Sequence, residues 1–229
     1  MRDLWLFGGT VVLVLLVVVA PVAAENFFDI FVGAALTDDT DVTLQAPSGR
    51  VIARGRPDTA FAVGGRFGHL YENLPWLGIS IGGSYFAPDA DLSLGSATVA
   101  GQELTVIPIS FQAAFRVPGL LATEEIPHGR LQPYAAVGPA LFISTLDGRI
   151  GAQRFSDTSL DVGLDARVGL TWQFDRHIGL FTEYRFTYLE PGWEDVIQGV
   201  RNRVETTLRT HHALVGITLR WLGSAGPGQ

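Results

Sequence analysis

Apolar and polar residues alternate along most of this chain with a period of two. The clearest case is residues 160–174, where every second residue from Leu160 to Phe174 is apolar and those between are Asp, Gly, Arg, Thr or Gln. Because successive side chains of a β-strand point to opposite faces, this pattern predicts a strand with one apolar and one polar face. A run of 15 residues is long for a soluble strand, which usually has about 5–6.

The alternation recurs often enough to predict eight strands. Two of them are less regular than the rest: residues 26–36, and residues 131–146, where Pro133 and Pro139 interrupt the pattern and both faces look apolar. The predicted strands are residues 26–36, 60–68, 77–86, 107–116, 131–146, 160–174, 178–188 and 213–221. An even number of strands is required to close an antiparallel barrel in a bacterial outer membrane.

Long and short connections alternate between these strands. The long ones are rich in polar residues, Gly and Pro, and cover residues 37–58, 88–102, 147–159 and 190–206. The short ones are residues 72–75 and 175–176. Outer-membrane barrels have long extracellular loops and tight periplasmic turns, so the alternation favours that class. Residues 117–129, with Glu124 and Glu125, break the rule, because about 13 residues stand where a short turn is expected.

The two faces of the predicted strands differ in a way that separates a membrane barrel from a soluble one. A soluble sandwich or lipocalin would bury the apolar face and turn charged or bulky polar groups to water. Here the minor face is mostly Gly, Ala, Ser and Thr, and aromatic residues lie near the strand ends of the apolar face, as in an interfacial girdle. That girdle is predicted to contain Trp76, Tyr85, Trp172, Tyr188 and Trp221. The predicted fold is therefore all-β: an eight-stranded antiparallel up-and-down transmembrane β-barrel.

Isolated charges on the minor face are predicted to form a network inside the barrel. Glu183 or Asp165 could pair with Arg167 or Arg185, because antiparallel strands joined by a short turn bring these rows side by side. Such a network could be a gate or solute path, or a structural plug of buried ion pairs; eight strands leave little lumen, which favours the plug. The predicted network comprises Arg66, Arg116, Asp161, Asp165, Arg167, Glu183, Arg185 and Arg220.

The first 24 residues are typical of a secretory signal. A short head with Arg2 precedes an apolar run from Leu4 to Val19, then Pro21 and small residues up to Ala24. Cleavage after Ala24 is expected, although an uncleaved anchor of about 17 apolar residues is the alternative. The expected domains are a signal peptide over residues 1–24, a barrel over 25–221 and a short flexible tail over 222–229.

Composition removes several function classes. A net charge of −7 excludes the basic face of a nucleic-acid-binding protein. The absence of Cys excludes disulfides, thiolate metal sites and cysteine nucleophiles. All 16 basic residues are Arg, whose planar fork binds carboxylates bidentately and keeps its charge, so the predicted network can draw on strong ion pairs.

Three segments carry a resemblance to a known family. Residues 131–141, 179–186 and 216–221 look like strands five, seven and eight of the outer-membrane β-barrel domain of the OmpA/OmpX-like porin superfamily. The resemblance implies a monomer in a Gram-negative outer membrane, placed there by the insertion machinery. It fixes no activity, because members are structural, adhesive or permeability proteins. The family usually ends on an aromatic residue, whereas residues 222–229 follow Trp221 here.

Other candidate chemistry is weak. The lipid A deacylase family has His two residues before Ser on its last strands, but His211 and His212 are followed by Ala and Leu, and no Gly-x-Ser-x-Gly motif occurs. His211 and His212 should face opposite sides of their strand. An amphipathic helical turn over residues 193–205 is a further weak signal. Acidic residues that could bind calcium, and basic ones that could meet lipid phosphates, are Asp38, Asp39 and Asp41, and Arg50, Arg54 and Arg56.

The sequence thus predicts a non-enzymatic outer-membrane barrel without a cofactor or metal, which supports envelope integrity and makes surface contacts through its loops. Its expected partners are outer-membrane lipids, lipopolysaccharide and the insertion machinery. The alternative function is a narrow porin-like channel for small solutes, followed by a lipid-modifying enzyme.

Overall fold

The computed structural model describes residues 25–46, 49–94, 97–150, 153–197 and 200–222, so the predicted signal peptide and all of the tail beyond Leu222 lie outside the described residues. No helix in this part of the chain is long and apolar enough to cross a membrane. The described strands, all antiparallel, are β1 (Glu25–Thr37), β2 (Thr40–Ala46), β3 (Gly49–Pro57), β4 (Ala60–Leu70), β5 (Leu77–Phe86), β6 (Asp89–Leu94), β7 (Ala97–Arg116), β8 (Leu131–Ile150), β9 (Gln153–Gln173), β10 (Ile178–Leu189), β11 (Gly192–Ile197), β12 (Val200–Glu205) and β13 (Leu208–Leu222).

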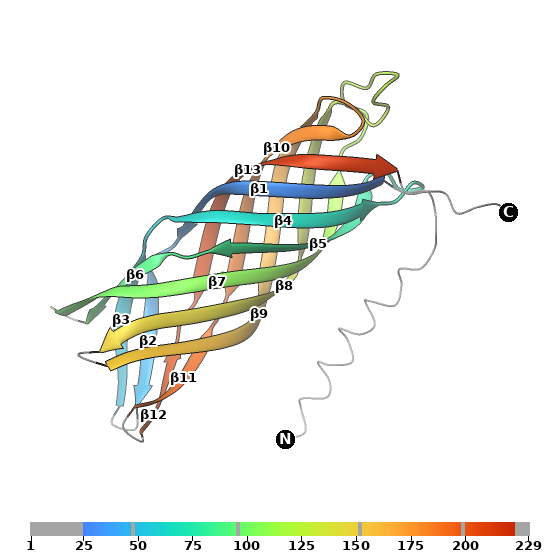
Figure 1. Cartoon of the computed structure of the whole chain (residues 1–229). Coiled ribbons are helices and arrows are strands. Elements are labelled where there is room, and N and C mark those ends of the chain that lie inside the picture. The colour runs from blue at the N-terminus through green and yellow to red at the C-terminus, as the bar shows by residue number, and fades with distance from the viewer. Residues whose placement is uncertain (1–24, 47–48, 95–96, 151–152, 198–199, 223–229) are drawn as a thin grey trace, which may run out of the picture.

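Eight of these strands close into a barrel (Figure 1). Around the wall the order is β1, β4, β5, β7, β8, β9, β10 and β13, and each strand pairs with its neighbours. The first and last strands complete the circle in a continuous register from Glu25 opposite Leu222 to Thr37 opposite Thr210. The predicted eight-stranded antiparallel barrel is confirmed.

The remaining strands continue the sheet beyond one end of the barrel, at the lower left of Figure 1. We call this extension the crown: it comprises β2, β3, β6, β11, β12 and the outer ends of β7, β8 and β9. Within it β12 pairs with β2, β2 with β3, β3 with β6 and β6 with β7. The pairing of β10 with β9 ends at Tyr188 opposite Leu164, so the described part of the crown is an open sheet with a seam between β9 and β11.

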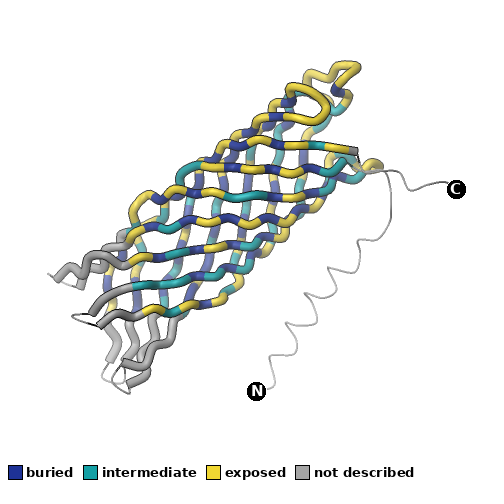
Figure 2. The backbone as a smooth tube through the Cα atoms, in the orientation of Figure 1, coloured by how far each residue is buried: buried dark blue, intermediate teal, exposed yellow. Residues whose placement is uncertain are grey.

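Burial alternates along the barrel strands as the sequence pattern predicts (Figure 2). In β5, for example, Gly78, Ser80, Gly82, Ser84 and Phe86 are buried, whereas the residues between them are exposed or half-buried. Exposed aliphatic and aromatic side chains therefore surround the outside of the barrel, and polar side chains are buried inside. Such a surface would be unfavourable in water, and soluble proteins seldom expose apolar patches of more than a few hundred Å². A lipid bilayer does favour it.

Several predicted loops are strands. The described residues between 193 and 205 belong to the paired strands β11 and β12 and not to a helical turn, so that interpretation is wrong. The outer ends of β7, β8 and β9 likewise extend into the predicted long loops. The physical reason is that strand pairing above the membrane satisfies backbone N–H and C=O groups even where the sequence shows no apolar alternation.

The long connection between β7 and β8 lies at the opposite end of the barrel from the crown, with the short turns. We call residues 117–130 the periplasmic cap. Inside it Gly119 N donates to His128 O (2.8 Å), and Thr123 and Ile126 bond to each other through their backbones. Ile126 is buried, and Arg176 Nε of the β9–β10 turn donates to Glu125 O (2.8 Å). The unexpected length of this connection is thus used to build a folded cap.

Candidate functional site

The lumen of the barrel contains a cluster of six charged residues that we call the inner cluster. Its cations are Arg66 of β4, Arg167 of β9 and Arg185 of β10, and its anions are Asp29 of β1, Asp165 of β9 and Glu183 of β10. All six are buried, and Arg185 is only 1% exposed. Three cations and three anions make the cluster neutral, as a buried set of charges must nearly be.

Asp165 joins two of the arginines. Arg167 donates to it through Nε and Nη2 (3.1 and 2.9 Å), and Arg185 does so through Nε and Nη2 (3.0 and 2.7 Å). The Ser110 hydroxyl also donates to this carboxylate, and Ser84 accepts from Arg185 Nη1 (2.6 Å). The Arg167 pair is bidentate, whereas both Arg185 nitrogens donate to Oδ2 alone; two bonds from each guanidinium group fix its orientation and leave it little freedom to move aside for a solute.

Arg66 joins the other two carboxylates. Its Nε and Nη2 donate to Asp29 Oδ2 (2.8 and 2.5 Å), and its Nη1 donates to Glu183 Oε2 (2.8 Å). Tyr134 donates its hydroxyl to the same Glu183 oxygen (2.7 Å). The Arg66 guanidinium also lies over the Tyr134 ring, 5.4 Å from its centroid, so the cluster is packed by aromatic faces as well as by charges.

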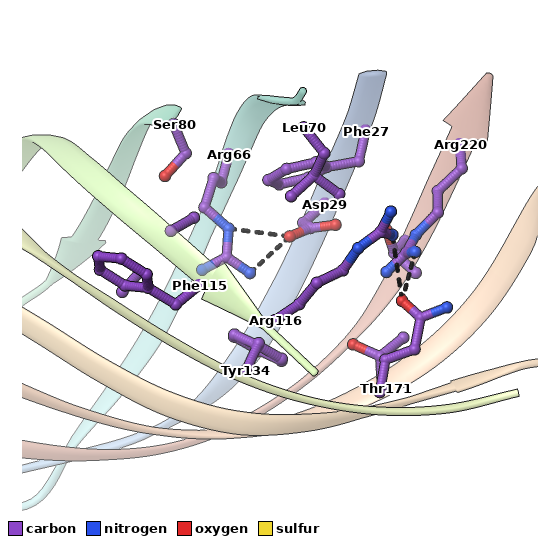
Figure 3. Close-up of a pocket in the computed structure, with 14 residues that line it drawn as sticks. Phe27, Asp29, Arg66, Leu70, Ser80, Phe115, Arg116, Tyr134, Thr171 and Arg220 are labelled. Carbon is purple, nitrogen blue, oxygen red and sulfur yellow. Dashed lines mark hydrogen bonds and ion pairs between the residues drawn. The ribbon is translucent and has the colours of Figure 1, made fainter. Parts of the chain in front are cut away.

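A second group, the mouth cluster, lies nearer the periplasmic end. Glu25 at the start of β1 pairs with Arg116 of β7 (2.7 Å) and with Arg220 of β13 (2.8 Å). Both arginines also donate to Gln132 Oε1, at 3.4 and 2.6 Å (Figure 3). Gln132 Nε2 donates to Gly129 O (2.7 Å), which ties the mouth cluster to the periplasmic cap.

A small cavity of about 40 Å³ separates the two clusters (Figure 3). Arg66, Asp29, Tyr134, Arg116 and Arg220 line it together with apolar groups. Its volume admits only a few water molecules. The hydroxyls of Ser80 and Thr218, which also line it, are buried without a protein partner, so water is the natural occupant.

Toward the crown the lumen is filled largely by apolar side chains, together with the buried polar side chains of Ser144, Thr187 and Thr210. Phe86 packs edge-on against the ring of His212, with centroids 4.9 Å apart, and His212 is 1% exposed. This apolar layer lies directly above Arg185 and Ser84 along β10 and β5. The buried apolar side chains of the outer half are Ala35, Ala60, Ala62, Phe86, Leu104, Val106, Ala140, Phe142, Leu189 and Leu208. The lumen is therefore occluded by a charged layer and an apolar layer in series.

The structure brings seven of the eight sequence-predicted lumen charges into these clusters and leaves one apart. Asp161 lies opposite Phe142 of the apolar layer in the β8–β9 register, at the seam of the crown, where it lines an open polar pocket of about 490 Å³ with Asp41, Glu190 and Glu205. Its Oδ2 atom is buried without a hydrogen-bond partner. Asp161 thus stands apart from both clusters, because it lies two inward positions beyond Asp165, opposite Phe142 of the apolar layer.

Sequence reasoning missed Glu25 and Asp29, the carboxylates that β1 contributes. Phe27 and Phe31 occupy the inward row beside Asp29, and Phe28 the outward row, so both faces of β1 look apolar. Asp29 itself could have indicated its position, because it is a charged residue in the middle of an otherwise apolar strand. A charged side chain that faces lipid is destabilising, so Asp29 must face the lumen. Tyr134, Ser84 and Gln132 could not be found without the register between strands.

The residues predicted for the aromatic girdle lie near the two rims. Trp76, Trp172 and Trp221 are near the periplasmic end, and Tyr85 and Tyr188 near the crown. Trp76 stacks on Phe115, with centroids 6.3 Å apart and an interplanar angle of 14°. Trp221 contacts Phe67, with centroids 6.0 Å apart. This two-rim distribution matches the interfacial belts of membrane proteins.

The other candidate residues are dispersed. His211 faces outward, where Tyr184 Oη lies 2.6 Å from its Nδ1 and Asp38 Oδ1 lies 3.5 Å from its Nε2, whereas His212 faces the lumen. No group of three or more His, Asp or Glu side chains in the described residues could hold a metal ion. Arg54 is exposed, and the side chains of Arg50 and Arg56 lie outside the described part.

The fold is similar to that of solved outer-membrane proteins. No protein-family model matches the sequence, and no curated protein matches it. The outer membrane protein OprG from Pseudomonas aeruginosa is 11% identical over 87% of this chain and 96% of that chain, with a TM-score of 0.66. Neisserial surface protein A (14% identical, covering 84% and 96% of the two chains) and the outer membrane protease OmpT from Escherichia coli (9%, covering 88% and 99%) have TM-scores of 0.45 and 0.44.

The likeness to OprG and the closed barrel indicate the fold, and the exposed apolar belt indicates that the barrel lies in a membrane. At 11% identity the likeness to OprG carries no statement about activity. The chain is therefore an eight-stranded β-barrel of the outer-membrane type, located in an outer membrane.

Proposed function

We propose that this protein is a non-enzymatic, non-conducting barrel that supports the envelope and presents the crown as a contact surface outside the cell. The observation that carries the proposal is the occluded lumen, in which the neutral inner cluster and the apolar layer around Phe86 follow one another along the barrel axis. A hydrated solute would have to separate Arg185 from Asp165 and displace Phe86, which leaves buried charges without partners.

The non-enzymatic part of the proposal rests on access. Ser84 and Ser110 are buried inside the wall and turned to Arg185 and Asp165, where an external substrate does not reach them. A nucleophile must come within hydrogen-bond distance of a base and of the substrate at once. Expected partners are outer-membrane phospholipids and lipopolysaccharide around the belt, with the insertion machinery acting during assembly of a monomer.

Planar-bilayer conductance of the purified protein tests the plug. We expect no discrete openings from the wild type, and the same from a control variant Arg209→Ala, whose side chain is exposed on β13 outside the lumen. Discrete openings of the wild type that disappear in Arg167→Ala or Arg185→Ala would overturn the plug and favour the narrow channel.

Deletion of the gene in its host tests the envelope role. We expect greater sensitivity to detergents and bulky antibiotics, restored by the full chain. A chain lacking the β11–β12 hairpin should restore the barrier but lose surface contacts, because the membrane wall does not contain these strands. An unchanged barrier and unchanged surface adhesion in the deletion strain would contradict the proposal.

A further inference from the structure

The periplasmic cap carries an apolar surface where a periplasmic turn would ordinarily be polar. Val117, Leu120 and Leu121 are 51%, 40% and 59% exposed. Single exposed aliphatic residues are common in proteins, but a contiguous exposed apolar patch marks an interaction surface. The cap therefore needs a partner for this face.

The backbone of the cap holds these leucines in a fixed place. Leu121 has φ 53°, in the left-handed region, which is unfavourable for a residue with a Cβ atom and persists only where the surroundings impose it. Arg130 N donates to Leu121 O and Leu131 N to Leu120 O, both at 3.2 Å. Gly129, with φ 91°, approaches so closely that a Cβ atom there would lie 2.3 Å from Leu120 O.

The cap does bury an apolar residue, but on its other side. Ile126 is only 4% exposed, and the chain beside it is anchored through Glu125 O to Arg176 and through Gly129 O to Gln132. One side of the cap is thus packed onto the barrel, while Leu120 and Leu121 are held outside. Leu120 and Leu121 are therefore exposed in a segment that is held by hydrogen bonds to the barrel and within the cap.

The outward row of β7, part of the lipid-facing belt, leads into the cap. On β7 the outward row runs through Phe111, Phe115 and Val117, all exposed, and enters the cap at Val117. Trp76 stacks on Phe115 at the same rim, where an interfacial aromatic marks the boundary of the bilayer. Apolar side chains beyond such a boundary suit the zone between headgroups and acyl chains.

We propose that the periplasmic cap inserts Leu120 and Leu121 into the periplasmic leaflet of the outer membrane, so that phospholipid is the partner of this face. Glu124 and Glu125, which are exposed farther along the cap, stay in water. The connection between β7 and β8 is then a one-sided membrane anchor at this rim.

Spin labelling tests the proposal directly, because the chain has no native Cys and single-Cys variants carry one label each. Leu121→Cys, Leu120→Cys, Glu124→Cys and Phe111→Cys are labelled and reconstituted in phospholipid vesicles. Accessibility to oxygen and to a water-soluble nickel chelate is then measured. We expect the labels at 120 and 121 to collide with nickel several-fold less often than the label at 124, and to approach the lipid-facing reference at 111.

Heat-modifiable gel migration establishes that each variant is a folded barrel before its label is read. If substitution of Leu121 prevents folding, Leu120→Cys carries the test alone. Labels at 120 and 121 as accessible to nickel as the label at 124 would overturn the proposal, and would indicate a periplasmic protein as the partner of this face.

Discussion

Asp165 is the residue on which the buried charges of the lumen depend most. Its carboxylate separates two arginines, Arg167 and Arg185, that lie directly opposite each other in the β9–β10 register. Without it, two guanidinium groups would remain buried beside each other with too few anions, and one unpaired buried charge costs more than a surface ion pair contributes. The carboxylate of Asp165 therefore matters mainly because it balances the charges of two buried arginines.

Asp165→Asn should destabilise the barrel by about 3–5 kcal/mol, because it removes one partner of a buried network. Asp161→Asn is the matched control: it is an inward position of the same strand, and its Oδ2 atom has no hydrogen-bond partner, so we expect a change of about 0.5 kcal/mol. Urea unfolding followed by Trp fluorescence measures both. Equal losses of unfolding free energy in the two variants would show that Asp165 does not hold the inner cluster together.

The turn between β9 and β10 gives a pH-dependent prediction. Asp175 Oδ1 accepts hydrogen bonds from His177 N (2.6 Å) and Ile178 N (2.8 Å), and these backbone bonds, that of His177 first, lower the pKa of the Asp175 carboxyl. A carboxylate whose pKa is lowered by folding stabilises the fold above its unfolded value of about 3.9, and this stabilisation is lost as pH falls through the lowered pKa.

Asp175→Ala should therefore unfold at lower urea than the wild type at pH 7, and the difference should narrow below about pH 4. Asp175→Asn keeps an acceptor oxygen and should lie between them, with a difference from the wild type that likewise shrinks in acid. A gap between wild type and Asp175→Ala that stays constant from pH 7 to pH 3 would show that the charge of this carboxylate does not contribute.

At the scale of elements, strands with a regular alternation of apolar and polar residues could be predicted from the sequence, and the others could not. β9 and β10 were placed within a few residues at their inner ends, because one row of each is uniformly apolar and lipid accepts nothing else there. The crown strands were missed, since residues above the membrane have water on either side and no alternation is imposed on them. The cap was recognised only as a departure from the rule of short turns.

Gly129→Ala should loosen the cap and leave the barrel intact. A Cβ atom would meet Leu120 O at 2.3 Å, and φ 91° is strained for alanine, so the cap should lose about 1–3 kcal/mol of local stability. Gly119→Ala is the matched control, because Gly119 also has a positive φ of 86° but open space around it. Cleavage by a Glu-specific protease at Glu124 and Glu125 should be faster in Gly129→Ala than in Gly119→Ala. Equal rates would show that the close approach to Leu120 is unimportant.

At the scale of the whole molecule, the eight-stranded barrel followed from the sequence, whereas the arrangement of its interior followed only in part. Alternation fixes which side of the wall a residue faces, so Arg66, Arg167 and Arg185 were placed inside. Register fixes which residues meet, and no pattern along a single strand contains it. Asp29 opposite Arg66, and Glu183 within reach of Tyr134, are consequences of register.

Removal of the crown hairpin tests how far the membrane barrel is independent of the crown. β10 and β13 remain paired up to Leu189 opposite Leu208, directly below β11 and β12. Replacing residues 190–207 by a short Asn-Gly turn should therefore give a chain that still migrates as a heat-modifiable barrel. A chain that no longer folds would show that the crown is required to close the wall.

The pairing of β1 with β13 sets the order of assembly. Glu25 and Arg220 form an ion pair across a sequence separation of 195 residues, and the strands that carry them are the first and last of the barrel. Until β13 arrives, β1 and β10 present unpaired edges, which in a lipid environment are costly and in water invite aggregation. The wall therefore cannot close until β13, its last strand, is in place, and the open edges of β1 and β10 need protection until then.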